Sequence, residues 1–375
     1  MTLEYDVVVC GAGMVGTALA YGMAGAGLRV LALDGDDTDL RAAKANFGLV
    51  WVQGKGFSKP EYQRLSHRSA QLWSDFGLTL EKETGIALGL EQRGGLHFCL
   101  GQTQLEDRAA RVSQWQAQLP EQASCVEMLE RGALERLLPG VRLGADVAGA
   151  SFGHTDGHVN PLRLLSALQY GFVARGGRLH HGCPVNRIRA LPGGGFDIEA
   201  VGKTYRAGRV VIAAGLGATP LGAMVGLDVP LHPQRGQLLV TERLAPLLPY
   251  PASGMRQTAE GAVMVGLTQE DVGFDTRTTT SAAARMSRQA LRIVPALAQA
   301  RWVRQWSCLR IMTPDGCPVY AESSTHPGAF IALCHSGVTL ASFHAGPLAQ
   351  AMGGARLSAE LDFFHHGRFD VRQAA

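Results

Sequence analysis

The sequence has little net charge and no long hydrophobic run. Its 35 Lys and Arg residues nearly balance its 32 Asp and Glu residues, so the net charge is +3, without a basic block. Nucleic acid and anionic membranes attract clustered positive charge, so neither is indicated as a partner. No apolar run reaches the roughly 20 residues of a membrane span. A signal peptide needs a charged start, whereas the first ten residues read as a strand, so we expect a cytoplasmic protein.

The seven cysteines lack the spacing of disulfides or metal clusters. Their number is odd and no Cys-x-x-Cys pair occurs, which argues against a disulfide framework and against an iron–sulfur or zinc cluster. The histidines do not suggest a metal site either. His154 and His158 lie in a turn-forming stretch, and His180 and His181 on a strand would face opposite ways. We therefore predict no metal.

The first 34 residues, in contrast, carry a specific pattern. An apolar run at residues 5–10 leads into GAGMVG at residues 11–16, and a second apolar run ends at Asp34. The order strand, glycine turn, helix, strand and acid is the dinucleotide-binding fingerprint. A carboxylate at Asp34 accepts hydrogen bonds from ribose hydroxyls and repels a 2′-phosphate. The pattern therefore disfavours NADP and leaves FAD or NAD.

Each glycine of the turn has its own expected role. Gly11 permits the tight turn, Gly13 lets the backbone approach a pyrophosphate, and Gly16 lets helix and strand pack closely. Met14 and Val15 begin the helix, whose free N–H groups and dipole favour the phosphates.

The rest of the chain indicates two lobes, for which 375 residues with 46% hydrophobic content are sufficient. Nucleotide-binding signals return only after residue 150, so we predict a nucleotide domain from residues 1–54, 146–219 and 306–375. Residues 55–145 and 220–305 would form a substrate domain from two insertions. The substrate is expected between the lobes.

Local signals predict several further elements. Asn160 and Pro161 should cap a helix that stops at Gly176. Residues 185–191, 196–202, 203–208 and 209–215 read as successive strands. Near the end, a strand should precede a helix that begins near Val338 or Thr339.

These motifs together resemble a known family, the D-amino-acid oxidase family of FAD enzymes that includes glycine oxidase and sarcosine oxidase. The motifs are GAGMVG, DGHVNP, VVIAAG, LRIMTPDGCPVY and CHSGVTLA, in the right order over nearly the whole chain. NFGLVWVQGKG adds a closer similarity to flavin-bearing β subunits of heteromeric dehydrogenases for opines and D-hydroxyproline. The resemblance implies an α/β and α+β fold, with a Rossmann-like FAD-binding domain and an interleaved substrate domain built on an antiparallel sheet.

The resemblance implies FAD rather than NAD, with the glycine turn and Asp34 at its ADP half. Around the rest of FAD it implies that Asn46, Gly48 and Leu49 lie along the flavin and that Val185 lies at the adenine. Ala214 and Gly215 would lie near the pyrophosphate or ribose. The backbone N–H groups at flavin N1 and the C2 carbonyl would come from Gly337, Val338, Thr339 and Leu340. A helix N-terminus there would stabilise the charge that hydride transfer leaves on the flavin. For Thr339 the alternative is a helix cap without a ligand.

The resemblance also implies that Arg310 binds the substrate, because Cys308, Leu309 and Arg310 match the family's GLR motif. A guanidinium binds a carboxylate with two parallel hydrogen bonds, which would hold the substrate C–H over flavin N5. The alternative for Arg310 is an ion pair on a strand. Further candidates for the pocket wall are His335, Tyr250, Arg256 and His344. Each of these is alternatively a satisfied core residue.

Two positions depart from the sarcosine oxidases. Cys308 stands where they carry the cysteine that bonds to the flavin, but the following Leu309 and Arg310 agree with glycine oxidase. We therefore expect that FAD is bound without a covalent bond and that Cys308 is a small packed thiol. The alternative is that Cys308 is covalently attached to the flavin. Met264 lies near the position of their oxygen-activating lysine, which favours an acceptor other than oxygen.

The main hypothesis is an FAD-dependent dehydrogenase that oxidises a secondary amine, an opine or a D-hydroxyproline-like imino acid. Hydride would pass to flavin N5, and electrons would leave through other subunits of a heteromeric complex. The first alternative is a self-contained glycine or D-amino-acid oxidase that produces hydrogen peroxide. The second alternative is a non-catalytic flavin-binding subunit.

Overall fold

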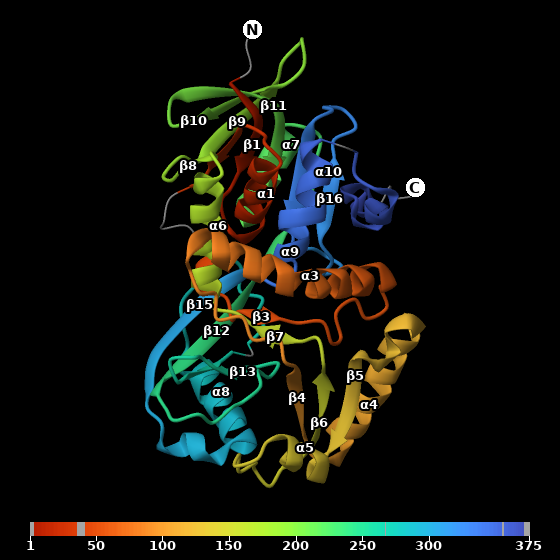
Figure 1. The fold of residues 1–375 in the computed structure, drawn as a ribbon, viewed down its shortest axis with the longest axis vertical. Helices are drawn as coiled ribbons and strands as arrows, with labels where there is room; N and C mark the ends of the chain where they lie inside the picture. Colours follow the sequence, from red (N-terminus) through yellow and green to blue (C-terminus); the bar gives the residue numbers. More distant parts are fainter. Residues whose placement is uncertain (1–3, 36–41, 267, 355, 371–375) are drawn as a thin grey trace.

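The computed structural model describes residues 4–35, 42–266, 268–354 and 356–370. The chain forms two lobes, one above the other in Figure 1. The upper lobe contains strand β1 (Tyr5–Cys10), and the long helix α3 (Pro60–Thr84) crosses between the lobes.

A mostly parallel sheet forms the upper lobe. Its strand order is β16 (Val319–Glu322), β17 (Ala329–Leu333), β11 (Lys203–Ile212), β1, β2 (Val30–Leu33) and β8 (Arg178–His180). All neighbours pair in parallel except β16, which is antiparallel to β17. The central strands are buried on both faces, as their unbroken apolar runs predict.

The meander beside this sheet differs from the prediction in one respect. Strands β9 (Val185–Ala190) and β10 (Phe196–Ala200) are present, but residues 203–208 and 209–215 do not form two strands. Instead, β11 runs without a break from Lys203 to Ile212. Ala207 pairs with Phe196 of β10 and with Tyr5 of β1, so one strand joins the meander to the parallel sheet.

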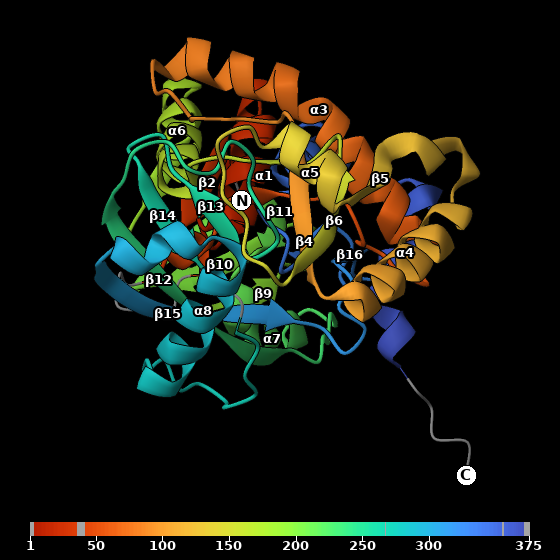
Figure 2. The ribbon, with the colours of Figure 1, turned by 90° about the horizontal axis from the view of Figure 1, so that it is seen from below.

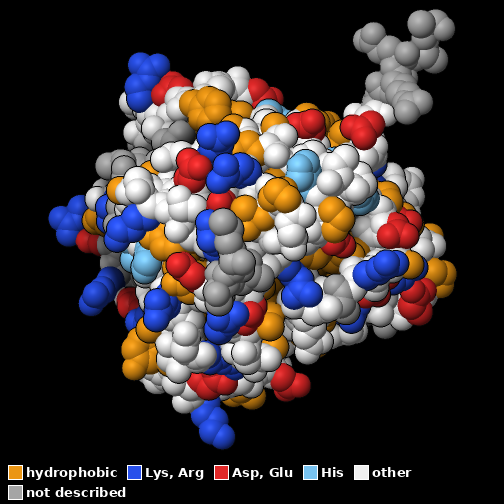
Figure 3. Space-filling model, turned by 90° about the horizontal axis from the view of Figure 1, so that it is seen from above, with side chains coloured by type: hydrophobic (Ala, Val, Ile, Leu, Met, Phe, Trp, Pro, Cys, Tyr) orange, Lys and Arg blue, Asp and Glu red, His pale blue; other side chains and the backbone are white. Residues whose placement is uncertain are grey.

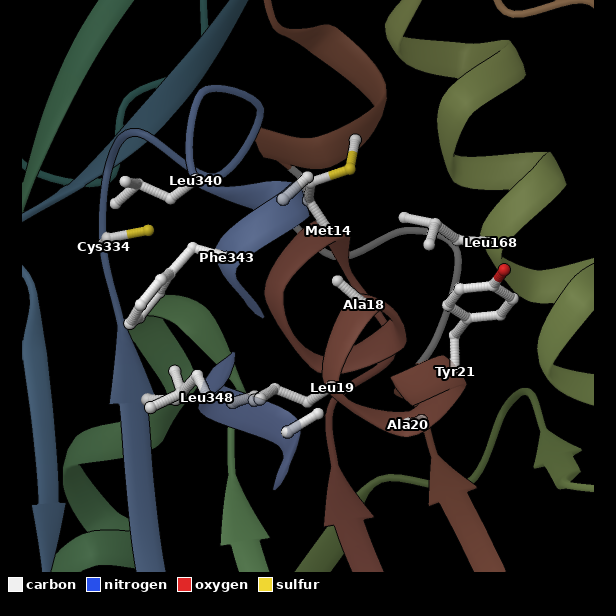
Figure 4. Packing of buried hydrophobic residues seen from close by; sticks show 14 of the residues in the cluster. Met14, Ala18, Leu19, Ala20, Tyr21, Leu168, Cys334, Leu340, Phe343 and Leu348 are labelled. Atoms are coloured by element: carbon white, nitrogen blue, oxygen red, sulfur yellow. The ribbon is translucent and has the colours of Figure 1, made fainter. Parts of the chain in front are cut away.

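Helix α1 (Met14–Gly25) packs on this sheet between α6 (Pro161–Ala174) and the C-terminal helical run. Figure 4 shows Ala18 and Leu19 of α1 facing Phe343 and Leu348 of that run. The expected cap of α6 is confirmed, because Asn160 Oδ1 accepts from the N–H groups of Leu162 and Arg163 at 3.1 and 3.2 Å.

The C-terminal helical run begins later than expected. It consists of α9 (Ala341–Phe343), a π-helical turn (His344–Leu348) and α10 (Ala349–Gly353). Residues 337–340 form a turn before it, in which Leu340 N–H donates to Ser336 O at 3.0 Å. Helix ends predicted from sequence are commonly wrong by a few residues. The reason is that the first turn of a helix has N–H groups without the regular intrahelical partners and closes in variable ways.

The lower lobe is built on antiparallel strands. One group is β13 (Met255–Gln257), β14 (Ala262–Val265), β12 (His232–Arg243) and β15 (Trp302–Met312); the other is β4 (Gly95–Leu100), β6 (Val147–Gly153) and β5 (Val126–Glu130). Helix α8 (Thr280–Ile293) lies on the side of the first group, and α4 (Gln102–Ala117) and α5 (Arg131–Leu137) lie with the second (Figures 1 and 2). The remaining short strands and α-helices among the described residues are α2 (Ala42–Ala45), β3 (Leu49–Val50), β7 (Gly157–His158) and α7 (Ala218–Ala223).

The chain passes between the two lobes at residues that differ slightly from the predicted domain boundaries. Strand β6 and all of β15 belong to the antiparallel lobe, although the boundaries at 146 and 306 assign β6 and part of β15 to the nucleotide domain. Helix α3, predicted in the substrate domain, packs on α9 and α6 of the upper lobe. The expected fold class is nevertheless confirmed, with a Rossmann-like domain and an antiparallel second sheet.

Charges of both signs are mixed over the surface. Lys and Arg side chains alternate with Asp and Glu on the face seen from above (Figure 3), as the net charge of +3 leads one to expect. Within the described part of the chain, no helix has the length and apolar character to cross a membrane.

Candidate active site

A cavity of about 750 Å³ lies where the two lobes meet. One end is lined by the glycine turn, Asp34 and residues 213–217 of the upper lobe. The other end is lined by Cys308 and Arg310 of β15 together with Gly236 of β12. Residues 332–339 extend along the same cavity. We call these the nucleotide end and the reaction end.

The glycine turn has the geometry that its sequence predicts. Gly11 has φ +102°, and a Cβ there would lie 2.6 Å from Ala213 O. A Cβ on Gly16 would collide with the carbonyl oxygen of Gly11. The nearest atom to a Cβ on Gly13 is Ala43 Cβ at 3.8 Å, so the cavity is open above Gly13. Gly13, Met14 and Val15 line this space at the N-terminus of α1, which suits a pyrophosphate.

Asp34 fixes the same turn. Its Oδ1 accepts from Ala12 N–H at 2.9 Å, and its Oδ2 lies 3.9 Å from His181 Nδ1. Asp34 lines the cavity, as do Val185, Ala214 and Gly215. The nucleotide end therefore offers phosphate-binding N–H groups and a carboxylate for ribose, which fits the ADP half of a dinucleotide.

The middle of the cavity is built from two segments that are distant in sequence. Thr339 Oγ1 accepts from Trp51 N–H at 3.1 Å and lies 3.3 Å from Leu49 O. Asn46 turns back on its own chain, because its Oδ1 accepts from Gly48 N–H at 2.9 Å. Thus the residues 46–49 that were expected along a flavin lie beside the turn at residues 337–340.

Three of the four expected N–H donors are available in this turn. Gly337, Val338 and Thr339 line the cavity, and their N–H groups have no acceptor among the described residues. Leu340 differs from the expectation, because its N–H is bonded to Ser336 O and its side chain is buried in the core. The three free donors fit the electron-rich edge of a flavin that carries N1 and the C2 carbonyl.

Arg310 lies at the reaction end without a carboxylate partner among the described residues. Its Nη1 donates to Thr268 O at 3.0 Å and lies 3.4 Å from Gln234 Oε1. Gly236 on the neighbouring strand makes room, since a Cβ there would lie 2.8 Å from the guanidinium. Burial lowers the pKa of Arg310 from its usual value, yet a guanidinium stays charged. Among the described residues, Arg310 therefore does not form the ion pair on a strand that was the alternative to substrate binding.

Cys308 and His335 share the reaction end with Arg310. Burial raises the pKa of the Cys308 thiol, which keeps it protonated. Burial lowers the pKa of His335 well below its usual value, and the charges of Lys55 and Arg310 add to this effect. His335 is therefore a neutral imidazole.

Lys55, which the sequence motifs did not single out, also lines the reaction end. Its Nζ donates to Ser336 Oγ at 2.6 Å and lies 3.2 Å from His335 Nε2. Burial lowers the pKa of Lys55 to about 8. The available signal was a lysine between two glycines in NFGLVWVQGKG, a segment already expected near the flavin.

The other three pocket candidates do not line the cavity. The Tyr250 ring packs edge-on against Phe152 at 5.2 Å. Arg256 Nε donates to Phe47 O at 2.5 Å. Arg256 therefore supports the segment at residues 46–49 without lining the cavity itself. His344 is buried, with Nε2 2.7 Å from Tyr320 Oη.

Comparisons with known proteins agree with this geometry. The family model described as DAO, FAD dependent oxidoreductase, matches residues 6–351. An opine oxidase subunit from Agrobacterium tumefaciens (strain Ach5) is 40% identical over 372 residues, which cover 99% of each chain.

Two solved structures are similar over nearly their whole length. The crystal structure of glycine oxidase from Geobacillus kaustophilus has a TM-score of 0.89 at 28% identity and covers 98% of this chain and 99% of that chain. The crystal structure of iminodiacetate oxidase from Chelativorans sp. BNC1 has a TM-score of 0.84 at 25% identity, with 96% and 99% covered. The glycine turn, Asp34 and the free N–H groups fit the cofactor that the family description names. The chain therefore belongs to the DAO family of FAD dependent oxidoreductases.

Proposed function

We propose that this enzyme oxidises the C–N bond of an amino acid with a secondary amine, of the kind found in opines. The observation that carries the proposal is Arg310, a cavity-lining guanidinium with no carboxylate partner among the described residues. The 40% identity to an opine oxidase subunit over the whole chain supports this substrate class. Bound FAD supplies the acceptor for the hydride that leaves the carbon beside nitrogen.

The residues of this chain would bind and orient. Arg310 binds the substrate carboxylate with parallel hydrogen bonds and so fixes which C–H faces the flavin. The N–H groups of Gly337, Val338 and Thr339 bind the flavin edge where negative charge develops. His335 is neutral and adds no charge beside the substrate amine, which must be unprotonated to lose a hydride from the adjacent carbon. The thiol of Cys308 stays free, so FAD is held without a covalent bond.

Electrons would pass to other subunits of a complex. The relative from Agrobacterium tumefaciens is described as a subunit, and no Cys-x-x-Cys pair in this sequence supplies a cluster of its own. A D-hydroxyproline-like imino acid is a second substrate candidate within the same chemistry. A self-contained oxidase that produces hydrogen peroxide is the alternative favoured by the similarity to glycine oxidase.

The test is an anaerobic titration of the purified yellow protein with opines, D- and L-prolines, hydroxyprolines, sarcosine and glycine. Loss of the flavin band with N-substituted amino acids supports the proposal, and loss with glycine alone supports the oxidase. Brisk peroxide release in air by the isolated chain would argue against transfer to partners. If no compound bleaches the flavin, the proposal fails for the isolated chain, and the result favours a partner-dependent or non-catalytic subunit.

A further inference from the structure

We propose that Lys55 binds a second substrate carboxylate, so that the cavity selects dicarboxylic secondary amines over monocarboxylic ones. The inference rests on the proposed function and names the substrate class of the same site. In such a substrate each carbon that flanks the nitrogen carries a carboxylate. Arg310 would hold one carboxylate and Lys55 the other.

The backbone around Lys55 is fixed firmly enough to aim its side chain. Lys55 N–H donates to Val52 O at 2.9 Å, and Lys55 O accepts from Trp115 Nε1 at 2.5 Å. The carboxylate of Asp156 accepts from the N–H groups of Val52 and Gln53 at 2.5 and 3.3 Å. The position of Lys55 at the cavity wall is therefore a property of the fold and not of a flexible loop.

The ammonium group of Lys55 is left with an unmet donor. Its two polar neighbours are Ser336 Oγ at 2.6 Å and His335 Nε2 at 3.2 Å. The Ser336 hydroxyl in turn contacts Tyr62 Oη at 2.7 Å. An ammonium has three N–H donors, and none of the ion pairs among the described residues includes Lys55. The remaining donor is available to a ligand in the cavity.

The charges that face Lys55 favour an anion. Burial, together with the positive charge of Arg310, lowers the pKa of Lys55 to about 8, and Asp156, whose own pKa burial raises to about 7, acts in the opposite direction. Burial raises the pKa of Cys334 to about 12 and keeps it neutral. His335 is neutral as well, and so is Tyr62, whose pKa burial raises. Arg310 and Lys55 are thus two cations at one end of the cavity.

Among the described residues, no carboxylate lines this end of the cavity to pair with them. Among the described residues that line the cavity, the one acidic side chain is Asp34, which lies at the nucleotide end. The carboxylate of Asp156 is already occupied by Val52, Gln53 N–H and the Gln53 amide. A monocarboxylate would neutralise Arg310 and leave Lys55 unpaired, whereas a dicarboxylate pairs both, and unpaired buried charge is costly.

The experiment uses two matched pairs of ligands on the FAD-loaded protein. Thiodiacetate and (ethylthio)acetate differ by one carboxylate and lack the nitrogen that oxidation needs, so their dissociation constants can be read from shifts of the flavin spectrum. N-(1-carboxyethyl)glycine and N-isopropylglycine are the oxidisable pair, read by the rate of anaerobic bleaching. We expect the wild type to prefer the dicarboxylate of each pair by about ten- to hundredfold.

Three variants isolate the contribution of Lys55. Lys55→Met should abolish the preference and leave monocarboxylate binding within about twofold. Lys55→Arg should keep most of the preference, and Lys82→Met, which removes an exposed lysine of α3, should keep all of it. As pH rises past 8, the wild-type preference should fall because Lys55 loses its proton, whereas Lys55→Arg should retain it to about pH 9.5.

Each result decides between alternatives. If the wild type binds both members of a pair equally, or if Lys55→Met weakens both equally, Lys55 is not a carboxylate site. Should Lys55→Met fail to retain FAD, the wild-type pairs and the pH arm of Lys55→Arg still decide. If neither N-substituted glycine bleaches the flavin, the proposed function fails, while the thioether pair still reports on Lys55.

Discussion

The two ends of the cavity recognise their ligands by different means. At the nucleotide end, recognition depends on backbone shape, because Gly11 and Gly16 make contacts that no side chain permits. At the reaction end, the proposed recognition depends on the charges of Arg310 and Lys55, which reach the cavity from distant parts of the chain.

This difference separates cofactor binding from substrate choice. A glycine turn at the N-terminus of a helix leaves little freedom in what it binds. Side chains on strands and loops can change without disturbing that turn, so one fold accommodates many substrates. Substitutions at the nucleotide end should therefore affect FAD content and stability, and those at the reaction end should affect substrate alone.

The largest effect is expected at Gly11. Gly11→Ala places a methyl group 2.6 Å from Ala213 O and forces φ +102° on a residue with a Cβ. We expect a loss of about 3 kcal/mol or more of stability and protein without flavin. The measurement is the flavin-to-protein absorbance ratio together with a thermal melt.

Gly193→Ala provides the control for Gly11→Ala. A Cβ on Gly193 meets nothing within 4 Å, so FAD content and melting temperature should stay close to the wild type. A yellow, stable Gly11→Ala protein would show that the turn can relax and that backbone shape does not govern the nucleotide end.

The next effect is expected at Arg310 and should leave the cofactor in place. Arg310→Ala should lower kcat/KM for the best substrate. The decrease should correspond to a loss of about 2–5 kcal/mol of transition-state stabilisation, because the substitution removes one partner of a buried charge pair. Arg310→Lys should recover part of this, as lysine provides the charge without the fork. Stopped-flow reduction measures the loss, and the flavin absorbance serves as the control. Equal activity of Arg310→Ala and wild type in the full complex would support a non-catalytic subunit.

The elements predicted well are those that local sequence determines. The turn from Gly11 to Gly16 and the Asn160 cap depend on residues a few positions apart, so their geometry can be read from spacing. The merged strand β11 could not be read in this way, because Ala207 is held by Phe196 on one side and Tyr5 on the other. Pairing with distant strands overrode the break suggested by Gly208.

The reaction end was harder to predict for the same reason. Arg310 was found through resemblance to a motif, whereas Lys55 meets His335 and Ser336 across about 280 positions of sequence. His344 and Arg256 lie in segments that do reach the cavity region, but their side chains turn into the core and toward Phe47. Which way a side chain turns depends on tertiary packing, and the sequence carries no local signal for it.

A moderate effect is expected at Asp34, where the nucleotide end depends on a side chain. Asp34→Ala removes the acceptor of Ala12 N–H and a partner for ribose. FAD affinity should fall by about ten- to hundredfold, and excess FAD should restore normal substrate binding. Titration of the apoprotein with FAD gives the affinity. If substrate discrimination changed as well, the two ends would not be independent.

The smallest effect is expected at Cys308. This residue tests whether the reaction end also holds the flavin through a covalent bond. Burial raises the pKa of this thiol and so lowers the fraction of thiolate that could attack a flavin. Acid precipitation of the wild type should therefore leave all the yellow colour in the supernatant, and Cys308→Ala should keep its full FAD content. Yellow colour in the precipitate of the wild type but not of Cys308→Ala would instead show a bond between β15 and the flavin. In that case the reaction end would hold the cofactor as well as the substrate, and the separation of roles between the two ends would be lost.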